Sequence, residues 1–181
     1  MEKVSTPRLK ETIEEITNIK HSPYVLYFQP QICLNSQEII GLEVLLRKRN
    51  HYNQIINPNE FIPELERTKE IITVGKWIIQ NSVLQLAKWQ QSGYKGMLSI
   101  NISVVQLTDE SLIPFIKEVL ELYQVQPSQI EFELTESFPV ENGQLLIMLD
   151  WLKQIGFRLA LDDFGTGFSS LSYLESYLLI H

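Results

Sequence analysis

Residues Leu159–Leu174 read LALDDFGTGFSSLSYL, and this stretch decides how the rest of the chain is interpreted. A short apolar run ends in two adjacent carboxylates, Asp162 and Asp163, and a glycine-bearing turn follows at once, Gly165–Gly167. The pattern is typical of a buried strand whose tip brings charge into a site, because two neighbouring acids repel each other unless a cation offsets them. A polar loop without chemistry is the alternative explanation for this stretch taken alone.

Upstream of this stretch, strand-like and helix-like segments alternate from Met97 onward. We expect strands over Met97–Ser103, Gln129–Thr135 and Arg158–Asp162, separated by amphipathic helices. That order favours parallel strands joined by helical crossovers. Two earlier strands, Tyr24–Leu34 and Ile39–Arg47, are separated by a short turn and are expected to form an antiparallel pair.

Helices are predicted where apolar residues recur with helical spacing between capping and stop signals. The expected helices are Thr6–Lys20 as a lead-in, Asn57–Glu66, Glu70–Ser92 before Gly93, one capped by Thr108 or Asp109 and reaching Tyr123, Glu141–Ile155 before Gly156, and Ser169–Tyr177. In the longest of them, the inward-facing positions are expected to be Ile72, Gly75, Ile79, Leu86 and Trp89. The chain is thus divided into a lead-in over residues 1–21 and one domain over residues 22–181.

Each predicted strand has one apolar face and one polar face. Strand alternation puts the following residues on polar faces: Gln29, Glu43, Asn101, Glu133 and Asp162. Parallel strands with a polar face do not suit an open sheet, because helices normally cover both of its sides. A barrel resolves the conflict, since its outer faces meet helices and its inner faces meet each other. The acids come late in their strands, at the rim where barrel enzymes carry their chemistry.

The converging side chains are oxygen donors. Glu43, Asn101, Glu133 and Asp162, with Asp163 at the adjoining tip, form a ligand set that suits Mg²⁺ or Mn²⁺. Several carboxylates around one point can hold two ions, which clamp a phosphoryl group and activate a water molecule. No cluster of histidine and cysteine supports zinc.

Arg47 lies on the same strand face as Glu43. Its guanidinium is able to bind a phosphate oxygen, and a surface ion pair is the alternative explanation.

Composition limits the classes of partner. The chain has 181 residues, 44% of them hydrophobic and 20% charged, with a formal net charge of −7. This balance argues against broad binding to a nucleic-acid polymer or to an anionic membrane, and a small anionic ligand would need a local cation. The single cysteine, Cys33, allows no internal disulfide. No apolar run approaches the ~20 residues of a membrane span and no signal peptide is recognised, so we expect a cytoplasmic protein.

Several segments together resemble the EAL domain of bacterial cyclic di-GMP phosphodiesterases. They occur in the family's order and cover roughly Ser22 to Tyr177: YFQP (Tyr27–Pro30), GLEVLLR (Gly41–Arg47), NEFIPELE (Asn59–Glu66), VGKWII (Val74–Ile79), SINIS (Ser99–Ser103), FELTES (Phe132–Ser137) and the stretch quoted above. The signature is Glu-Val-Leu here rather than Glu-Ala-Leu, and Val44 points outward by strand parity, so we expect the change to affect packing.

The resemblance implies an α/β fold, a TIM-type (β/α) barrel with an antiparallel first strand. It also implies a phosphodiesterase that hydrolyses cyclic di-GMP to the linear dinucleotide pGpG with Mg²⁺ or Mn²⁺. The family pattern makes Glu43, Asn101, Glu133, Asp162 and Asp163 metal ligands, Glu43, Asp162, Asp163 and Glu136 catalytic, and Gln29 and Arg47 substrate-binding. Glu136 matches the glutamate that steadies the loop after Asp163.

The end of the chain departs from the family pattern. A TIM barrel typically needs ~250 residues, so we expect a barrel that is incomplete at the C-terminus, the N-terminal two-thirds of the domain. Leu178 stands where the family has a proline, and the strand with the catalytic lysine would follow His181. A non-catalytic cyclic di-GMP-binding or protein-interaction module is therefore the alternative function, and a truncated gene product is a third. Exposed strand edges would favour a homodimer or a regulatory protein partner.

Overall fold

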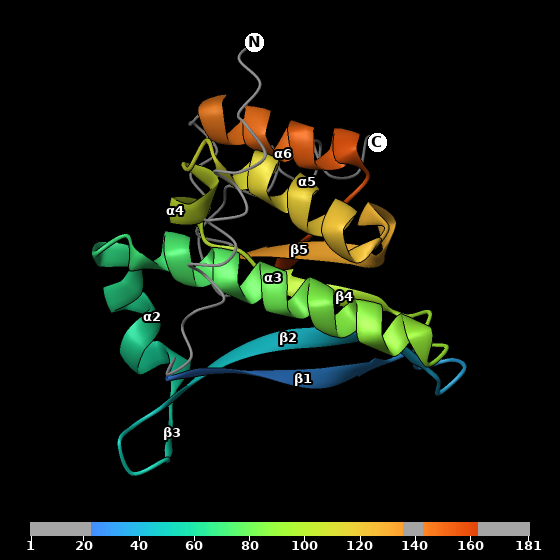
Figure 1. Cartoon of the computed structure of the whole chain (residues 1–181), viewed down its shortest axis with the longest axis horizontal. Helices are drawn as coiled ribbons and strands as arrows, with labels where there is room; N and C mark the ends of the chain where they lie inside the picture. Colours follow the sequence, from blue (N-terminus) through green and yellow to red (C-terminus); the bar gives the residue numbers. More distant parts are fainter. Residues whose placement is uncertain (1–22, 136–142, 163–181) are drawn as a thin grey trace.

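A mixed sheet with helices packed against one of its faces forms the centre of the molecule (Figure 1). The structure is a computed structural model, and it describes residues 23–135 and 143–162. The strands are β1 (Tyr24–Ile32), β2 (Ile39–Arg49), β3 (Ile55–Ile56), β4 (Met97–Asn101), β5 (Ile130–Thr135) and β6 (Arg158–Asp162). Their order is β1-β2-β4-β5-β6, with β3 paired to β2.

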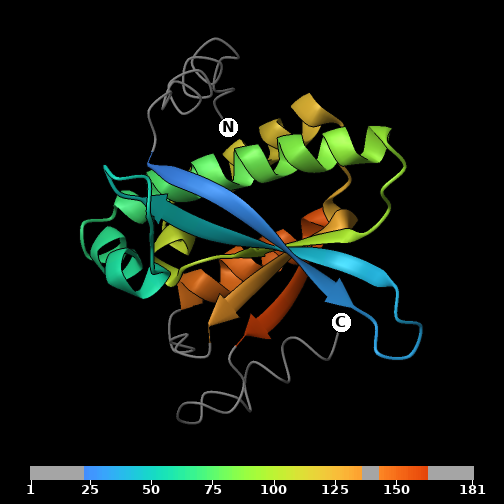
Figure 2. The same cartoon turned by 90° about the horizontal axis from the view of Figure 1, so that it is seen from below.

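The first strand runs opposite to most of the others. β1 pairs with β2 in antiparallel fashion, whereas β2, β4, β5 and β6 are parallel neighbours. The predicted antiparallel pair and the predicted parallel order are both confirmed. Figure 2 shows the parallel arrows of β4, β5 and β6 fanning across the sheet while β1 crosses β2 in the opposite sense.

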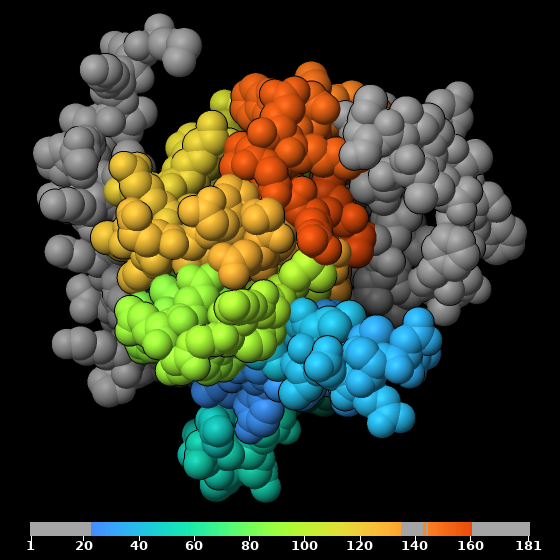
Figure 3. Space-filling view, turned by 90° about the vertical axis from the view of Figure 1, so that its right-hand side faces the viewer, coloured from blue at the N-terminus to red at the C-terminus, as the bar shows by residue number. Residues whose placement is uncertain are grey.

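Helices connect the parallel strands and cover the apolar side of the sheet. They are α2 (Pro58–Arg67), α3 (Glu70–Gln91), α4 (Val104–Leu107), α5 (Leu112–Tyr123) and α6 (Gly143–Ile155), with a 3₁₀ turn at Pro127–Gln129. α3, α5 and α6 lie on one side of the strands (Figure 1). Figure 3 shows the amino-terminal end of the parallel strands, where the segments that lead into β2, β4, β5 and β6 lie side by side. The carboxyl ends of these strands are therefore at the opposite end of the molecule.

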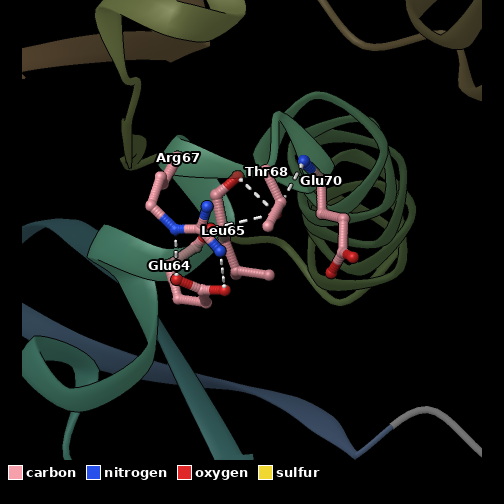
Figure 4. A network of polar contacts seen from close by, with 5 residues as sticks. All are labelled: Glu64, Leu65, Arg67, Thr68 and Glu70. Carbon is pink, nitrogen blue, oxygen red and sulfur yellow. Dashed lines mark hydrogen bonds and ion pairs between the residues drawn. The ribbon is translucent and has the colours of Figure 1, made fainter.

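The corner between α2 and α3 is fixed by local hydrogen bonds (Figure 4). The Arg67 guanidinium donates to both carboxylate oxygens of Glu64, at 2.8 and 2.6 Å. The Thr68 hydroxyl donates to the Glu64 carbonyl at 2.9 Å and so ends α2. Lys69 then adopts a left-handed backbone with φ of 62°, which turns the chain into α3.

The predicted cap of the helix that reaches Tyr123 is wrong. That prediction began the helix at Thr108 or Asp109, but a separate short helix, α4, comes first and α5 begins only at Leu112. The Asp109 carboxylate accepts hydrogen bonds from the backbone N–H and the hydroxyl of Ser111, at 3.1 and 2.7 Å. Such a side-chain turn competes with helix formation, and the same carboxylate also pairs with Lys76 of α3 at 2.6 Å.

The core lies between the sheet and α3, α5 and α6. Its largest fully buried strand residues include Leu98 and Ile100 of β4 and Phe132 and Leu134 of β5. These side chains alternate with polar ones along each strand, as the sequence predicted. Of the positions predicted to face inward on α3, Gly75, Ile79 and Leu86 are buried, and Ile72 and Trp89 are half-buried against the core.

The predicted fold class is confirmed: the described residues form the antiparallel first pair and the parallel strands of a TIM-type α/β barrel, over part of its length. No helix among the described residues is long and apolar enough to cross a membrane. The predicted helices over Thr6–Lys20 and Ser169–Tyr177 lie outside the described residues, and the division at residue 21 remains a prediction.

Candidate functional site

The polar faces of the strands come together on the side of the sheet that faces away from α3, α5 and α6. The register pairs Gln29 with Glu43 and Asn101 with Glu133 across neighbouring strands. Asp162, the last residue of β6, lies beside Thr135 at the end of β5. The strand alternation read from the sequence therefore brings these positions to one surface, toward the carboxyl ends of the parallel strands.

Glu43 and Asn101 are in direct contact. Asn101 Nδ2 donates to Glu43 Oε1 at 3.0 Å across β2 and β4. This hydrogen bond orients the Glu43 carboxylate and turns the amide so that Asn101 Oδ1 is the atom available to a cation. Asn101 is exposed and Glu43 is half-buried, so neither side chain is fully removed from solvent.

Glu133 is the buried member of the group. Its side chain is 9% exposed, and a carboxylate removed from water needs donors or a cation to compensate its lost hydration. Gln31 Nε2 of β1 lies 3.5 Å from Glu133 Oε1 and 3.3 Å from the Ser99 hydroxyl. Strand alternation predicts no role for Gln31 or Ser99 in the site, although Gln31 lies on the same face of β1 as Gln29.

Arg47 lies with Asn101 on the wall of a cavity of about 390 Å³. The cavity is lined by polar residues of α2, of the end of β4 and of the chain after it, and by apolar residues of β2 and α3, among them Asn59, Glu66, Asn101, Ser103, Val44, Leu46, Ile71 and Ile78. Arg47 Nη1 donates to the Leu46 carbonyl at 2.9 Å, which uses one of the five guanidinium N–H groups. The remaining N–H groups of the guanidinium are donors that could bind an anion.

The loop that follows Asn101 is held by Ser103. Its hydroxyl donates to Glu66 Oε1 of α2 at 2.6 Å and accepts from the Val105 N–H at 3.3 Å. Its backbone N–H donates to Gln106 Oε1 at 3.0 Å, which completes a capping box at the start of α4. This arrangement fixes the chain two residues beyond Asn101, and the sequence signal for it is the Ser-x-x-Gln spacing.

The donor set fits a hard divalent cation. Glu43, Asn101 and Glu133 provide carboxylate and amide oxygens on adjacent strands, and such oxygens are the ligands of Mg²⁺ and Mn²⁺. Within the described residues there is no cluster of three or more His, Cys, Asp or Glu side chains that would hold a metal by itself. The side chain of Asp162, and Glu136 and Asp163 altogether, lie outside the described part, so their predicted roles remain predictions.

Comparison with protein families gives one clear result. A family model described as "EAL domain" matches residues 14–178. Among curated proteins, Signaling protein YkoW of Bacillus subtilis is 41% identical over 160 residues, 88% of this chain and 20% of that protein. Cyclic di-GMP phosphodiesterase PdeR of Escherichia coli is 34% identical, over 96% of this chain and 28% of that protein. The chain thus spans less than a third of the length of these relatives.

Solved structures agree with the sequence match. A structure described as "PaMucR Phosphodiesterase, c-di-GMP complex" superposes with a TM-score of 0.79 at 29% identity. The matched region covers 93% of this chain and 68% of that one. A second structure, "Structure of EAL Enzyme Bd1971 - cAMP and cyclic-di-GMP bound form", has a TM-score of 0.75 at 28% identity, over 93% of this chain and 48% of that one.

Proposed function

The chain belongs to the EAL domain family, and from this membership we propose that it forms the metal-holding and substrate-binding part of a phosphodiesterase that hydrolyses cyclic di-GMP to pGpG. The observation that carries the proposal is the Glu43–Asn101 hydrogen bond of 3.0 Å, with Glu133 on the next strand. It brings the signature glutamate into contact with a second predicted ligand. The relatives support the substrate class, since PdeR is named a cyclic di-GMP phosphodiesterase and the MucR structure is described as a c-di-GMP complex.

Glu43, Asn101 and Glu133 would hold Mg²⁺ or Mn²⁺, together with the predicted ligands Asp162 and Asp163. When bound, two such ions supply a hydroxide nucleophile at neutral pH and stabilise charge on the phosphate. The chain needs this cation, because its formal net charge is −7 and its substrate is an anion. Asn101 orients the Glu43 carboxylate for the ion by donating to one of its oxygens.

Arg47 is the described residue best suited to bind a phosphate oxygen of the substrate. Its guanidinium lines the cavity next to Asn101 and keeps N–H groups beyond the one that bonds the Leu46 carbonyl. Gln29 lies opposite Glu43 in the register of β1 and β2, where it would contact the substrate from the other side of the signature glutamate. Glu136 would steady the loop that follows Asp163.

The test is a turnover assay with cyclic di-GMP and Mn²⁺, in which pGpG is separated and quantified. We expect Glu43→Ala to abolish pGpG formation, because it removes a metal ligand and the partner of Asn101. Arg47→Ala should weaken substrate binding. The matched control is Glu64→Ala, which removes a glutamate that is paired with Arg67 on the surface and should leave turnover unchanged.

Binding of labelled cyclic di-GMP, measured on the same samples, distinguishes the second candidate function. Saturable binding without any pGpG would refute hydrolysis by this chain and leave a binding module. Absence of both binding and turnover would refute the proposed substrate.

A further inference from the structure

A chain of side-chain hydrogen bonds lies on the inner face of the sheet beside the carboxylates. Gln31 Nε2 donates to the Ser99 hydroxyl at 3.3 Å and to Glu133 Oε1 at 3.5 Å. The Ser99 hydroxyl donates in turn to Glu131 Oε1 at 3.1 Å. One amide thereby connects β1 to β4 and β5, although β2 lies between β1 and β4 in the sheet.

Gly41 of β2 makes this reach across the sheet possible. It faces Gln31 in the β1–β2 register, and a Cβ built on it would lie 2.6 Å from Gln31 Oε1. Such a separation is far inside van der Waals contact, so any larger residue would displace the Gln31 side chain. A glycine in a strand often marks a close approach of this kind.

The Gln31 amide provides hydrogen-bond donors to two acceptors, the Ser99 hydroxyl and the Glu133 carboxylate. Glu133 is 9% exposed and Ser99 is fully buried, so both need hydrogen-bond partners within the protein. A glutamine amide has two N–H donors, and Gln31 uses them on these two groups. Donation to one oxygen of a carboxylate restricts the rotation of that carboxylate. It also leaves the negative charge intact, which a lysine or arginine would cancel.

We propose that Gln31 is a positioning residue that holds the Glu133 carboxylate in the orientation needed to bind the divalent cation, with Ser99 fixing the Gln31 amide and Gly41 providing its path. This inference rests on the proposed function, in which Glu133 is a metal ligand. Groups that orient metal ligands from outside the coordination sphere typically contribute 10- to 100-fold to metal affinity.

The first test measures Mn²⁺ affinity on the full chain by electron paramagnetic resonance, without substrate. Gln31→Leu keeps the approximate size of the side chain and removes both donors, and we expect the Kd for Mn²⁺ to rise about 10-fold or more. The spectrum of bound Mn²⁺ should also change, because one ligand is reoriented. The matched control is Gln90→Leu, which removes an amide hydrogen bond of 2.7 Å to Gln129 outside the site and should change the Kd by less than about 2-fold.

The second test needs no metal. A double-mutant cycle combines Gln31→Leu with Glu133→Leu in excess EDTA and compares the equilibrium constants of unfolding. Residues in contact are coupled, so we expect the double variant to depart from additivity by roughly 2- to 10-fold.

The outcomes separate the two proposals. If wild-type protein binds Mn²⁺ and Gln31→Leu binds it equally well, or if the cycle is additive, the role of Gln31 is refuted while the proposed function stands. If wild-type protein binds no Mn²⁺, the metal site of the proposed function is refuted. Non-additive effects in the double-mutant cycle would then show that Gln31 supports Glu133 structurally, without a role in metal binding.

Discussion

Gly75 provides the sharpest test of how α3 supports the site. In an isolated helix, Gly75→Ala would stabilise by about 1 kcal/mol, because alanine has the higher helix propensity. In this protein a Cβ at Gly75 would overlap Gln106 Nε2 and lie 2.6 Å from Gln106 Cδ. Gln106 is 4% exposed, and any movement of its side chain away from the new Cβ breaks its hydrogen bond to the Ser103 N–H.

The expected cost outweighs the propensity gain. Overpacking of a buried site costs about 1–3 kcal/mol. Displacement of Gln106 also breaks its bond to the Ser103 N–H, half of the capping box at α4, and loss of a cap costs about 1 kcal/mol. Subtracting the gain of about 1 kcal/mol, we expect Gly75→Ala to lower the free energy of unfolding by about 1–3 kcal/mol.

The assay is urea unfolding followed by tryptophan fluorescence, with Trp77 on α3 as a reporter close to the substitution. Gly143→Ala is the control, because Gly143 begins α6 and a Cβ there would meet nothing within 4 Å; its effect should be within about 0.5 kcal/mol.

A double-mutant cycle with Gln106→Ala tests the mechanism of the Gly75→Ala cost. Removing the Gln106 side chain relieves the clash, so Gly75→Ala should cost at least about 1 kcal/mol less in that background. Additive effects, or a Gly75→Ala protein more stable than wild type, would refute the reasoning.

Three further predictions follow from the described contacts. Lys76→Met should cost about 1 kcal/mol at pH 7 by removing the Asp109 ion pair, in which the two side chains are 13% and 19% exposed. Arg67→Met at the fully exposed pair on α2 should leave stability unchanged in the same assay. Burial raises the pKa of the Asp109 carboxyl, but the hydrogen bonds that it accepts from Lys76 and Ser111 outweigh this effect, so its pKa in the folded state is below the ordinary value. The cost of Lys76→Met is therefore fully present above the ordinary carboxyl pKa and should disappear as the pH falls through the lowered folded-state pKa. Unfolding curves recorded over this pH range test it, and a cost that persists in acid would contradict the assignment. Phe132→Ala should lower the free energy of unfolding by about 3–5 kcal/mol, since this side chain is fully buried between the sheet and the helices; a loss under about 1 kcal/mol in urea unfolding would show that the core is elsewhere. Mn²⁺ at about 100 times its Kd should stabilise the wild type by about 2.7 kcal/mol in thermal unfolding, and the effect should vanish in Glu43→Ala and on addition of EDTA; an equal effect in that variant would place the ion away from Glu43.

The elements that could be predicted from sequence are those specified by local patterns. β6 has the bounds that were expected, Arg158–Asp162, because an apolar run follows Gly156, whose φ of 108° is a glycine conformation. α3 ends within one residue of its prediction. Predictions are wrong where a side chain interacts with a residue far away in the sequence. Asp109 was predicted as a possible helix cap, but it forms an ion pair with Lys76 of α3 instead. β3 was not predicted because only two residues pair with β2, too few to form a pattern.

The candidate site divides in the same way. Glu43, Asn101 and Glu133 are identified by strand alternation alone, since period-two spacing determines which face a residue occupies. Strand alternation could not predict the hydrogen bonds of Gln31, because its side chain has to pass over Gly41 to reach Ser99. The absence of a Cβ at Gly41 on β2 and the long amide side chain of Gln31 on β1 can be connected only when the register that pairs these two residues is known.

The chemistry of these contacts bears on how an acidic protein would bind an anion under the proposed function. The described hydrogen bonds to the candidate carboxylates come from neutral groups, the amides of Asn101 and Gln31. Neutral donors orient a carboxylate without cancelling its charge, and a charged carboxylate is the ligand that a hard divalent cation prefers. Under the proposed function, a bound divalent cation would reverse the local charge and so favour the approach of a phosphodiester. A lysine in place of either amide would form the stronger pair with its carboxylate, but it would neutralise the charge that the proposed metal ion would bind.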